Sequence, residues 1–216
     1  KTPLASTKLL LETLSLRKFS ADKVEQYHQT MSRENERLSL LVENFLTFSS
    51  IEQNKFKVKI SGVDCGSFLD EVNSAVKDRF SDDYSRLKID NACPSACQFK
   101  GDSSALLHAV LNLVENAFKY SAEEVTLKLT SEHQQICFSV IDLGIGLDAV
   151  QQKKIFKRFH QVDRSLSSGT YGCGLGLSIV DGIIRAHGSK VIVESEKGSG
   201  SRFSFVLKEQ MNEDMS

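Results

Sequence analysis

Two long stretches at the start of the chain have the spacing of amphipathic helices. They run from Leu4 to Phe19 and from Asp22 to Ile51, and both are rich in Leu, Glu, Lys, Gln and Ser. Apolar positions in the second recur at nearly heptad intervals, with a break at Glu34 and Asn35. The pattern predicts an antiparallel helical hairpin. Because two helices bury little surface alone, we expect it to form a four-helix bundle with a second copy; packing on its own chain is the alternative.

After Asn54 the pattern changes to short strands mixed with helices. Alternating residues predict a first strand over Lys55–Ile60. Helical spacing predicts helices over 65–80, 105–120, 149–156 and 175–187, and further strands are predicted at 87–89, 97–99, 124–130, 135–141, 190–195 and 201–207. This mixed order predicts an α+β fold, a two-layer sandwich with helices on one face of a mixed sheet. We therefore divide the chain into a hairpin domain, 1–54, and a sandwich domain, 55–216.

Composition adds mainly exclusions. The 216 residues are 40% hydrophobic and 25% charged, with a net charge of -1, so no overall field indicates a nucleic-acid or membrane partner. No apolar run approaches the roughly 18 residues of a membrane span, and no signal peptide is present. We expect a soluble, cytoplasmic chain without membrane contact, and the start at Lys1 without a Met suggests an excised fragment.

The five cysteines are scattered and odd in number, which favours a reducing compartment over a disulfide framework. Cys93 and Cys97 are close enough in sequence to suggest a metal site. No second pair and no histidine at zinc spacing accompanies them, so we expect free thiols.

The predicted helix 105–120 carries a polar stripe beside its apolar one. Asn112, Glu115, Asn116 and Lys119 share one face. Amide oxygens can complete the shell of a hard cation without adding charge, and lysine is a compact charge suited to phosphate. The stripe predicts a site for a metal-bound polyphosphate.

A second candidate is the pentapeptide from Asp142 to Gly146, at the end of a predicted buried strand. It places a carboxylate in a dry pocket, where two glycines let the backbone approach a flat ligand. Such a carboxylate can accept from an exocyclic amino group, whereas a keto oxygen facing it would cost on the order of 1–3 kcal/mol. A plain turn is the alternative.

A third candidate is the glycine-rich loop with Gly172, Gly174 and Gly176, directly before an apolar helix. Its backbone N–H groups and the helix N-terminus can face an anion. It matches neither a Rossmann nor a Walker A motif. The alternative is that the glycines form a flexible hinge. The loop could be both an anion site and a hinge if it is a lid that becomes ordered when it binds phosphate.

The segment between these motifs, from Ile155 to Ser165, contains two aromatic residues three apart, Phe156 and Phe159. We expect them to anchor the base of the lid. The basic residues Lys157, Arg158 and Arg164 are candidate phosphate or partner contacts, although charged loop residues are more often solvated.

Together these motifs resemble those of bacterial sensor histidine kinases. Residues 112–120 resemble the N box, 142–146 the G1 box, 155–159 the F box and 172–177 the G2 box, and the order and spacing also fit. Residues 1–4 resemble the end of the phosphoacceptor box, so the resemblance covers essentially the whole chain. It implies a dimerisation hairpin followed by a Bergerat-type (GHKL) ATP-binding domain.

The resemblance also implies cofactors and residue roles. Asn116 would ligate Mg²⁺ with Asn112 nearby, and Lys119 would touch the phosphates of ATP. Tyr120 would pack near the adenine and Asp142 would bind its amino group. The remaining positions implied at the nucleotide are Gly144 and Gly146 at the base, Phe156 and Arg158 in the F box, and Gly172, Gly174, Leu175 and Gly176 at the phosphates.

Two departures from the family pattern stand out. The phosphoacceptor histidine would lie three positions before Lys1, and Gln161 stands where relatives commonly carry an arginine. Thr2 matches the position that assists dephosphorylation of a partner regulator, or is only a first-turn residue before Pro3. Glu115 is either a general base or an exposed helix carboxylate.

The expected activity is phosphoryl transfer from Mg·ATP to a histidine on the hairpin and then to an aspartate of a response regulator. One rival is a GHKL ATPase, but those relatives have a glutamate where this chain has Asn112, and an amide cannot act as a base. The other rival is a nucleotide-binding scaffold that docks a regulator without transfer. The sequence identifies neither the signal, the regulator, nor transfer in cis or trans.

Overall fold

The computed structural model describes residues 3–16, 19–158 and 174–210. Its contacts divide the chain into two compact units, Lys1–Ser49 and Ser50–Ser216. The predicted domain boundary after residue 54 stays a prediction. No described helix is both long enough and apolar enough to cross a membrane.

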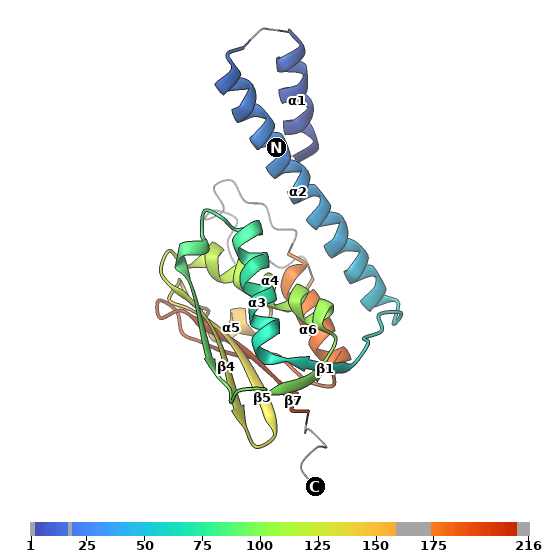
Figure 1. Cartoon of the computed structure of the whole chain (residues 1–216), viewed down its shortest axis with the longest axis vertical. Coiled ribbons are helices and arrows are strands. Elements are labelled where there is room, and N and C mark those ends of the chain that lie inside the picture. Colours follow the sequence, from blue (N-terminus) through green and yellow to red (C-terminus); the bar gives the residue numbers. More distant parts are fainter. Residues whose placement is uncertain (1–2, 17–18, 159–173, 211–216) are drawn as a thin grey trace. The chain divides into compact units, whose positions relative to one another are not determined.

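The first unit is a pair of helices. Helix α1 spans Pro3–Leu16 and α2 spans Ala21–Glu52, with α1 running beside the N-terminal part of α2 (Figure 1). The rings of Phe19 and Tyr27 meet edge to face near the connection, with centroids 5.3 Å apart. The predicted helical hairpin is confirmed.

The second unit is built on a five-stranded sheet in the order β2-β4-β5-β7-β6. Only β2 and β4 are parallel, so the sheet is mixed. The strands are β2 (Leu87–Ala92), β4 (Val125–Glu132), β5 (Gln135–Asp142), β6 (Ile192–Ser195) and β7 (Ser201–Lys208). A small second sheet pairs β1 (Ser61–Asp64) with β3 (Gln98–Gly101).

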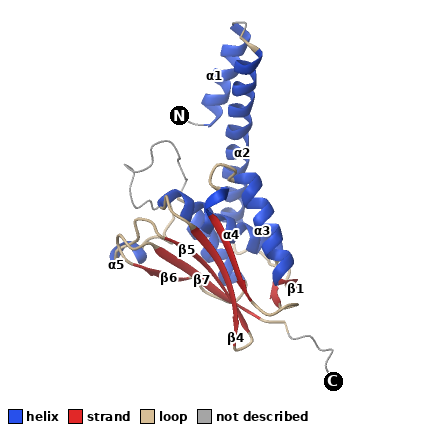
Figure 2. Ribbon diagram, turned by 60° about the vertical axis from the view of Figure 1, so that its left-hand side comes forward, coloured by secondary structure: helices blue, strands red, loops and turns tan. Residues whose placement is uncertain are grey.

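Three helices cover one face of the large sheet, namely α3 (Cys65–Arg79), α4 (Ser103–Tyr120) and α6 (Gly176–Ala186), as Figures 1 and 2 show. Two short elements complete the unit, the 3-10 turn η1 (Tyr84–Arg86) and α5 (Ala149–Gln152). The predicted α+β sandwich, with a mixed sheet and helices on one face, is confirmed.

The core lies between the sheet and these helices because alternate strand residues face inward. In β5 the inward residues are Ile136, Phe138 and Val140, all essentially inaccessible. The Phe138 ring stacks on Phe205 of β7 at 4.9 Å and meets Phe99 edge to face at 5.1 Å. This aromatic cluster fixes β5, whose end carries Asp142.

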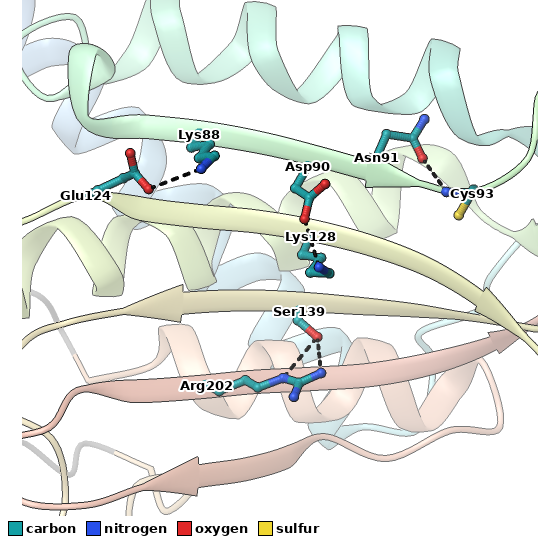
Figure 3. A network of polar contacts seen from close by, with 8 residues as sticks. All are labelled: Lys88, Asp90, Asn91, Cys93, Glu124, Lys128, Ser139 and Arg202. Carbon is teal, nitrogen blue, oxygen red and sulfur yellow. Dashed lines mark hydrogen bonds and ion pairs between the residues drawn. The ribbon is translucent and has the colours of Figure 1, made fainter.

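The opposite face of the sheet is polar (Figure 3). Lys128 pairs with Asp90 across β4 and β2 at 2.8 Å, and Arg202 of β7 donates to the Ser139 hydroxyl at 3.1 Å. Ion pairs at such half-exposed positions add little stability. Because this face carries polar side chains, it needs no covering layer of helices.

Two predicted elements are wrong in their details. The segment Lys55–Ile60 does not form a strand, and the strand begins at Ser61. The reason is that the Lys59 N–H donates to the Asp102 carboxylate at 2.8 Å and so has no strand partner. The helix predicted over 149–156 ends at Gln152 and continues as turns, in which Ile155 is buried.

Candidate functional site

The polar stripe of α4 is fixed at its start by Asp102. The Asp102 carboxylate accepts the N–H of Ala105 at 3.1 Å, which caps the helix, and the Asp102 N–H donates to Nε2 of His187 at 3.0 Å. Since His187 ends α6, the cap also connects α4 with α6. The position of the polar stripe therefore depends on both helices, because Asp102 fixes the start of α4 and is bonded to the end of α6.

Asn112 is buried and faces the first residue of α6. Its Nδ2 donates to the His108 carbonyl at 2.9 Å, one turn earlier on α4. A Cβ atom on Gly176 would lie only 2.9 Å from its Oδ1. The glycine thus lets the start of α6 approach the Asn112 amide closely.

The other three stripe residues are half-buried and have different surroundings. Glu115 pairs with Arg79 of α3 at 3.4 Å. The Lys119 ammonium lies 5.1 Å from the centre of the Tyr120 ring. Within the described part of the chain, neither the Asn116 amide nor the Lys119 ammonium has a hydrogen-bond or ion-pair partner. Asn116 and Lys119 are thus free to bind a ligand.

Asp142 is a buried carboxylate, 5% exposed, at the end of β5. Burial raises its pKa, although the N–H groups of Gly144 and Ser201 oppose the shift by donating to the carboxylate. The bond from Gly144 is 2.8 Å long. The protein therefore keeps an acceptor in a desolvated position, where an unpaired donor on a ligand would be strongly preferred.

The loop after β5 is joined to the end of α4. The Ile145 N–H donates to the Tyr120 carbonyl at 3.2 Å, and a Cβ on Gly144 would collide with that same oxygen. Gly146 has a φ of 60°, which favours glycine, and a side chain there would collide with the Glu196 carbonyl. Both glycines are thus required for folding, whether or not they also shape a base pocket.

These contacts bring most of the predicted site residues into two groups along α4. Asn112 and Gly176, which directly follows Leu175, form one group. Lys119 and Tyr120 lie with Asp142 and Gly144 at the C-terminal end of the helix, about 12 Å from Asn112 at 1.5 Å per residue. An elongated ligand with a polyanionic end and a flat end fits this spacing.

The F-box residues are only partly described. Phe156 is half-buried, and Arg158 forms an ion pair with Glu52 at the end of α2. Gly174 has a φ of 68° and Leu175 is buried directly before α6. Thr2, Gly172 and the predicted positions from 159 to 171 lie outside the described residues.

Comparison with protein families gives two matches along the chain. The family described as "Histidine kinase-, DNA gyrase B-, and HSP90-like ATPase" matches residues 101–211, and the "His Kinase A (phospho-acceptor) domain" matches residues 1–54. The chain belongs to the sensor histidine kinase family.

Three named sensor kinases are among the relatives of this chain. It is 29% identical over 211 residues to "Sensor-like histidine kinase SenX3" of Mycolicibacterium smegmatis, covering 97% of this chain and 54% of that protein. It is 30% identical to "Phosphate regulon sensor protein PhoR" of Pseudomonas aeruginosa, covering 94% and 46%, and 32% identical to "Autoinducer 2 sensor kinase/phosphatase LuxQ" of Vibrio vulnificus, covering 94% and 24%. The chain spans about half the length of SenX3 and PhoR.

Solved histidine kinases share the fold. The structure of AdeS from Acinetobacter baumannii superposes with a TM-score of 0.71 at 22% identity, covering 96% of this chain and 95% of that one. Full-length ShkA in complex with AMPPNP also gives 0.71, at 25% identity, covering 98% of this chain and 47% of that one.

Sequence reasoning missed two partners of the kinase motifs. Arg79, which engages Glu115, and Ser201, whose N–H reaches Asp142, lie far from the motifs in sequence. The pairing of β5 with β7 sets Ser201 opposite Asp142. The glycine turn before Ser201 was the only sequence signal for that register.

Proposed function

We propose that this chain binds Mg·ATP along α4 and passes the γ-phosphoryl group to a histidine of the helical hairpin. From there an aspartate of a response regulator takes the phosphoryl group. Family membership supports the reaction class, and the ShkA structure contains a non-hydrolysable ATP analogue. By the family resemblance, the acceptor histidine is expected three positions before Lys1.

The observation that carries this proposal is Asp142. Its buried carboxylate lies next to the end of α4 and to the loop of Gly144 and Gly146. It can accept from the exocyclic amino group of adenine. Guanine presents a keto oxygen at the corresponding position, which would face the carboxylate unpaired. The site is therefore expected to prefer ATP over GTP.

From the base, the phosphates would run along α4 past Lys119 and Asn116 toward the start of α6. The half-buried amide of Asn116 and the Lys119 ammonium suit a hard cation and a phosphate, respectively. When bound, Mg²⁺ would supply charge neutralisation at the phosphate oxygens. The protein's contribution is positioning and charge, and the amide at Asn112 favours transfer over hydrolysis because it cannot activate water.

A homodimer through the hairpin is part of the proposal. Apolar side chains remain more than half exposed on both of its helices: Leu4, Leu9, Leu11 and Leu16 on α1, and Phe45 and Leu46 on α2. A second copy would bury them in a four-helix bundle.

The binding part is tested with Asp142→Asn in the full chain. The one remaining amide oxygen is held by the Gly144 N–H, so the amide NH2 would face the amino group of adenine. We therefore expect the affinity for ATP to fall about ten- to hundredfold. Asp90→Asn is the matched control, because Asp90 is a half-exposed carboxylate on the other face of the same sheet. Unchanged ATP affinity in Asp142→Asn, or equal binding of GTP by the wild type, would contradict the site.

The transfer part is tested with a chain extended upstream through the expected histidine and incubated with γ-labelled ATP. An acid-labile, base-stable label on the protein supports the kinase. Tight ATP binding without label would favour the docking scaffold. Steady ATP hydrolysis by the unmodified chain would favour the ATPase, whereas gain of hydrolysis only in Asn112→Glu fits the transfer mechanism.

A further inference from the structure

Three cysteines from two separate segments of the second unit meet at one point. Cys65 is the first residue of α3, and Cys93 and Cys97 lie in the connection between β2 and β3. Their three Sγ atoms all lie within 4.8 Å of one another. Cys65 and Cys97 are buried and Cys93 is half-buried. Among the described residues this is the one group of three or more cysteine, histidine or acidic side chains with such spacing.

The backbone around the cluster is held by specific bonds. The Cys65 N–H donates to the Cys97 carbonyl at 2.9 Å, and the Cys97 N–H closes a turn onto the Pro94 carbonyl at 3.3 Å. Within that turn Ala96 has a φ of 63°, a conformation that normally takes glycine or asparagine. The turn folds the chain back so that Cys93 and Cys97 face the same point, and such strain persists only where the surroundings impose it.

Glu209, directly after β7, supplies an oxygen beside the Cys97 thiol, at the edge of the cluster. Its Oε1 accepts the Cys97 thiol at 3.2 Å, while its Oε2 accepts the hydroxyl of Ser131 at 3.1 Å. Its N–H donates to the Gln134 carbonyl at 3.0 Å. Both backbone and side chain thus hold one carboxylate oxygen toward the thiols.

We propose that Cys65, Cys93, Cys97 and Glu209 bind one zinc ion as a closed, four-coordinate structural site. Zinc takes tetrahedral sulfur and oxygen ligands with Zn–S near 2.3 Å, which sets ligand sulfurs about 3.8 Å apart. The three Sγ atoms therefore need only a small contraction. Each thiol releases its proton on binding, and the carboxylate completes the shell.

The ligand set also selects the metal class. Thiolates favour zinc over Mg²⁺, which prefers an all-oxygen shell.

The cluster is remote from the proposed nucleotide site. Lys208 pairs with Gln135 at the start of β5, whereas Asp142 is at the end of that strand, seven residues or about 24 Å away. A zinc ion here would join the start of α3, the β2–β3 connection and the end of β7, rather than contact phosphate. Its loss and loss of nucleotide binding are therefore separable.

The test uses the full chain, reduced and freed of metal with a chelator, and titrated with Co²⁺ or Zn²⁺ alone. We expect one equivalent to bind, with thiolate-to-cobalt charge-transfer absorption and a rise in Tm on adding zinc. Cys93→Ser, at the most exposed of the three cysteines, should abolish the absorption and the rise in Tm. Ser131→Ala, which removes only the hydroxyl that orients Glu209, should weaken zinc binding about tenfold.

Cys137→Ser is the matched control, because Cys137 is a half-buried cysteine on β5 outside the cluster. It should bind zinc as the wild type does, and all three variants should retain wild-type ATP affinity. The proposal would be overturned by the absence of thiolate absorption in the reduced wild type, by equal binding in Cys93→Ser, or by a disulfide among the three cysteines in place of metal binding.

Discussion

Gly176 and Gly66 occupy the first turns of two helices, yet their surroundings differ. A Cβ on Gly176 would press on the buried Oδ1 of Asn112, whose amide nitrogen is already bonded to His108. A Cβ on Gly66 would make only an ordinary contact, 3.4 Å from Oδ1 of Asp64. Replacing each glycine by alanine therefore distinguishes the effect of helix propensity, at Gly66, from the effect of tertiary packing, at Gly176.

We expect Gly66→Ala to stabilise the protein by up to about 0.5–1 kcal/mol, because alanine is the better helix former. Gly176→Ala should lose this gain and weaken ATP binding, since Asn112 or the start of α6 must move. Urea unfolding and ATP titration of both variants measure the two effects. Equal stabilisation in both, with unchanged ATP affinity, would refute the close packing of Gly176 on Asn112.

Glu115 has a partner that the sequence did not indicate. Its carboxylate is paired with Arg79, and both side chains are partly exposed. A pair of this kind contributes about 0–1 kcal/mol to stability. Glu115→Gln should therefore destabilise the protein by less than about 1 kcal/mol and slow autophosphorylation of the extended chain less than tenfold.

A general base contributes about 10²–10⁴-fold to rate, so a loss of that size in Glu115→Gln would assign that role to Glu115. Arg79→Gln is the control, because it removes the same ion pair from the other side, together with the contact of the guanidinium with the Phe80 ring. Equal small losses in both variants indicate a structural pair.

At the scale of elements, Asp102 determines where α4 begins. Burial raises the pKa of its carboxyl, but the N–H groups of Lys59 and Ala105 and the hydroxyl of Ser104 outweigh this, so that the pKa lies below 3.8. The ionised form is therefore favoured by folding. Its contribution to stability is present above pH 3.8 and is lost as the pH falls through the lowered pKa.

We expect Asp102→Ala to lower the free energy of unfolding by about 1–2 kcal/mol near neutral pH, the usual cost of losing an N-cap. Asp102→Asn keeps one acceptor oxygen and should lose less. Urea unfolding near neutral pH and well below pH 3.8 provides the measurement, and the difference between wild type and Asp102→Asn should shrink in acid. If the difference in free energy of unfolding grew in acid, the pKa of Asp102 would be raised by folding rather than lowered.

At the scale of the whole molecule, the hairpin is the part that needs a partner. Val42, Phe45 and Leu46 follow the i, i+3, i+4 spacing of one helix face and are each at least 50% exposed. Burying a large apolar side chain contributes about 1.5–3 kcal/mol. A dimer that covers this face should be sensitive to any one of these residues.

Phe45→Ser should weaken dimerisation at least about tenfold, as measured by analytical ultracentrifugation over a dilution series. Glu43→Ser, at an exposed polar position of the same helix, is the control and should dimerise as the wild type does. A monomeric wild type at high concentration, or equal dimerisation of Phe45→Ser, would exclude this face as the interface.

Local pattern alone determined the fold class and most elements. Helical spacing placed α3 and α4 within a few residues, because amphipathic helices and alternating strands carry their burial pattern in the sequence. The motif residues of α4 and the end of β5 were identified for the same reason, since each motif is continuous in sequence.

Only the tertiary structure decided which distant groups meet. The strand at Ser61–Asp64, rather than at Lys55–Ile60, depends on a partner in β3, about forty residues later. The proposed metal-ligand geometry at Cys93 and Cys97 became visible only when folding added Cys65 and Glu209. A backbone bond from Cys65 to Cys97 and a bridge between Phe99 and Glu209 bring these residues together. Side-chain periodicity records burial along one element, but not which other element covers it.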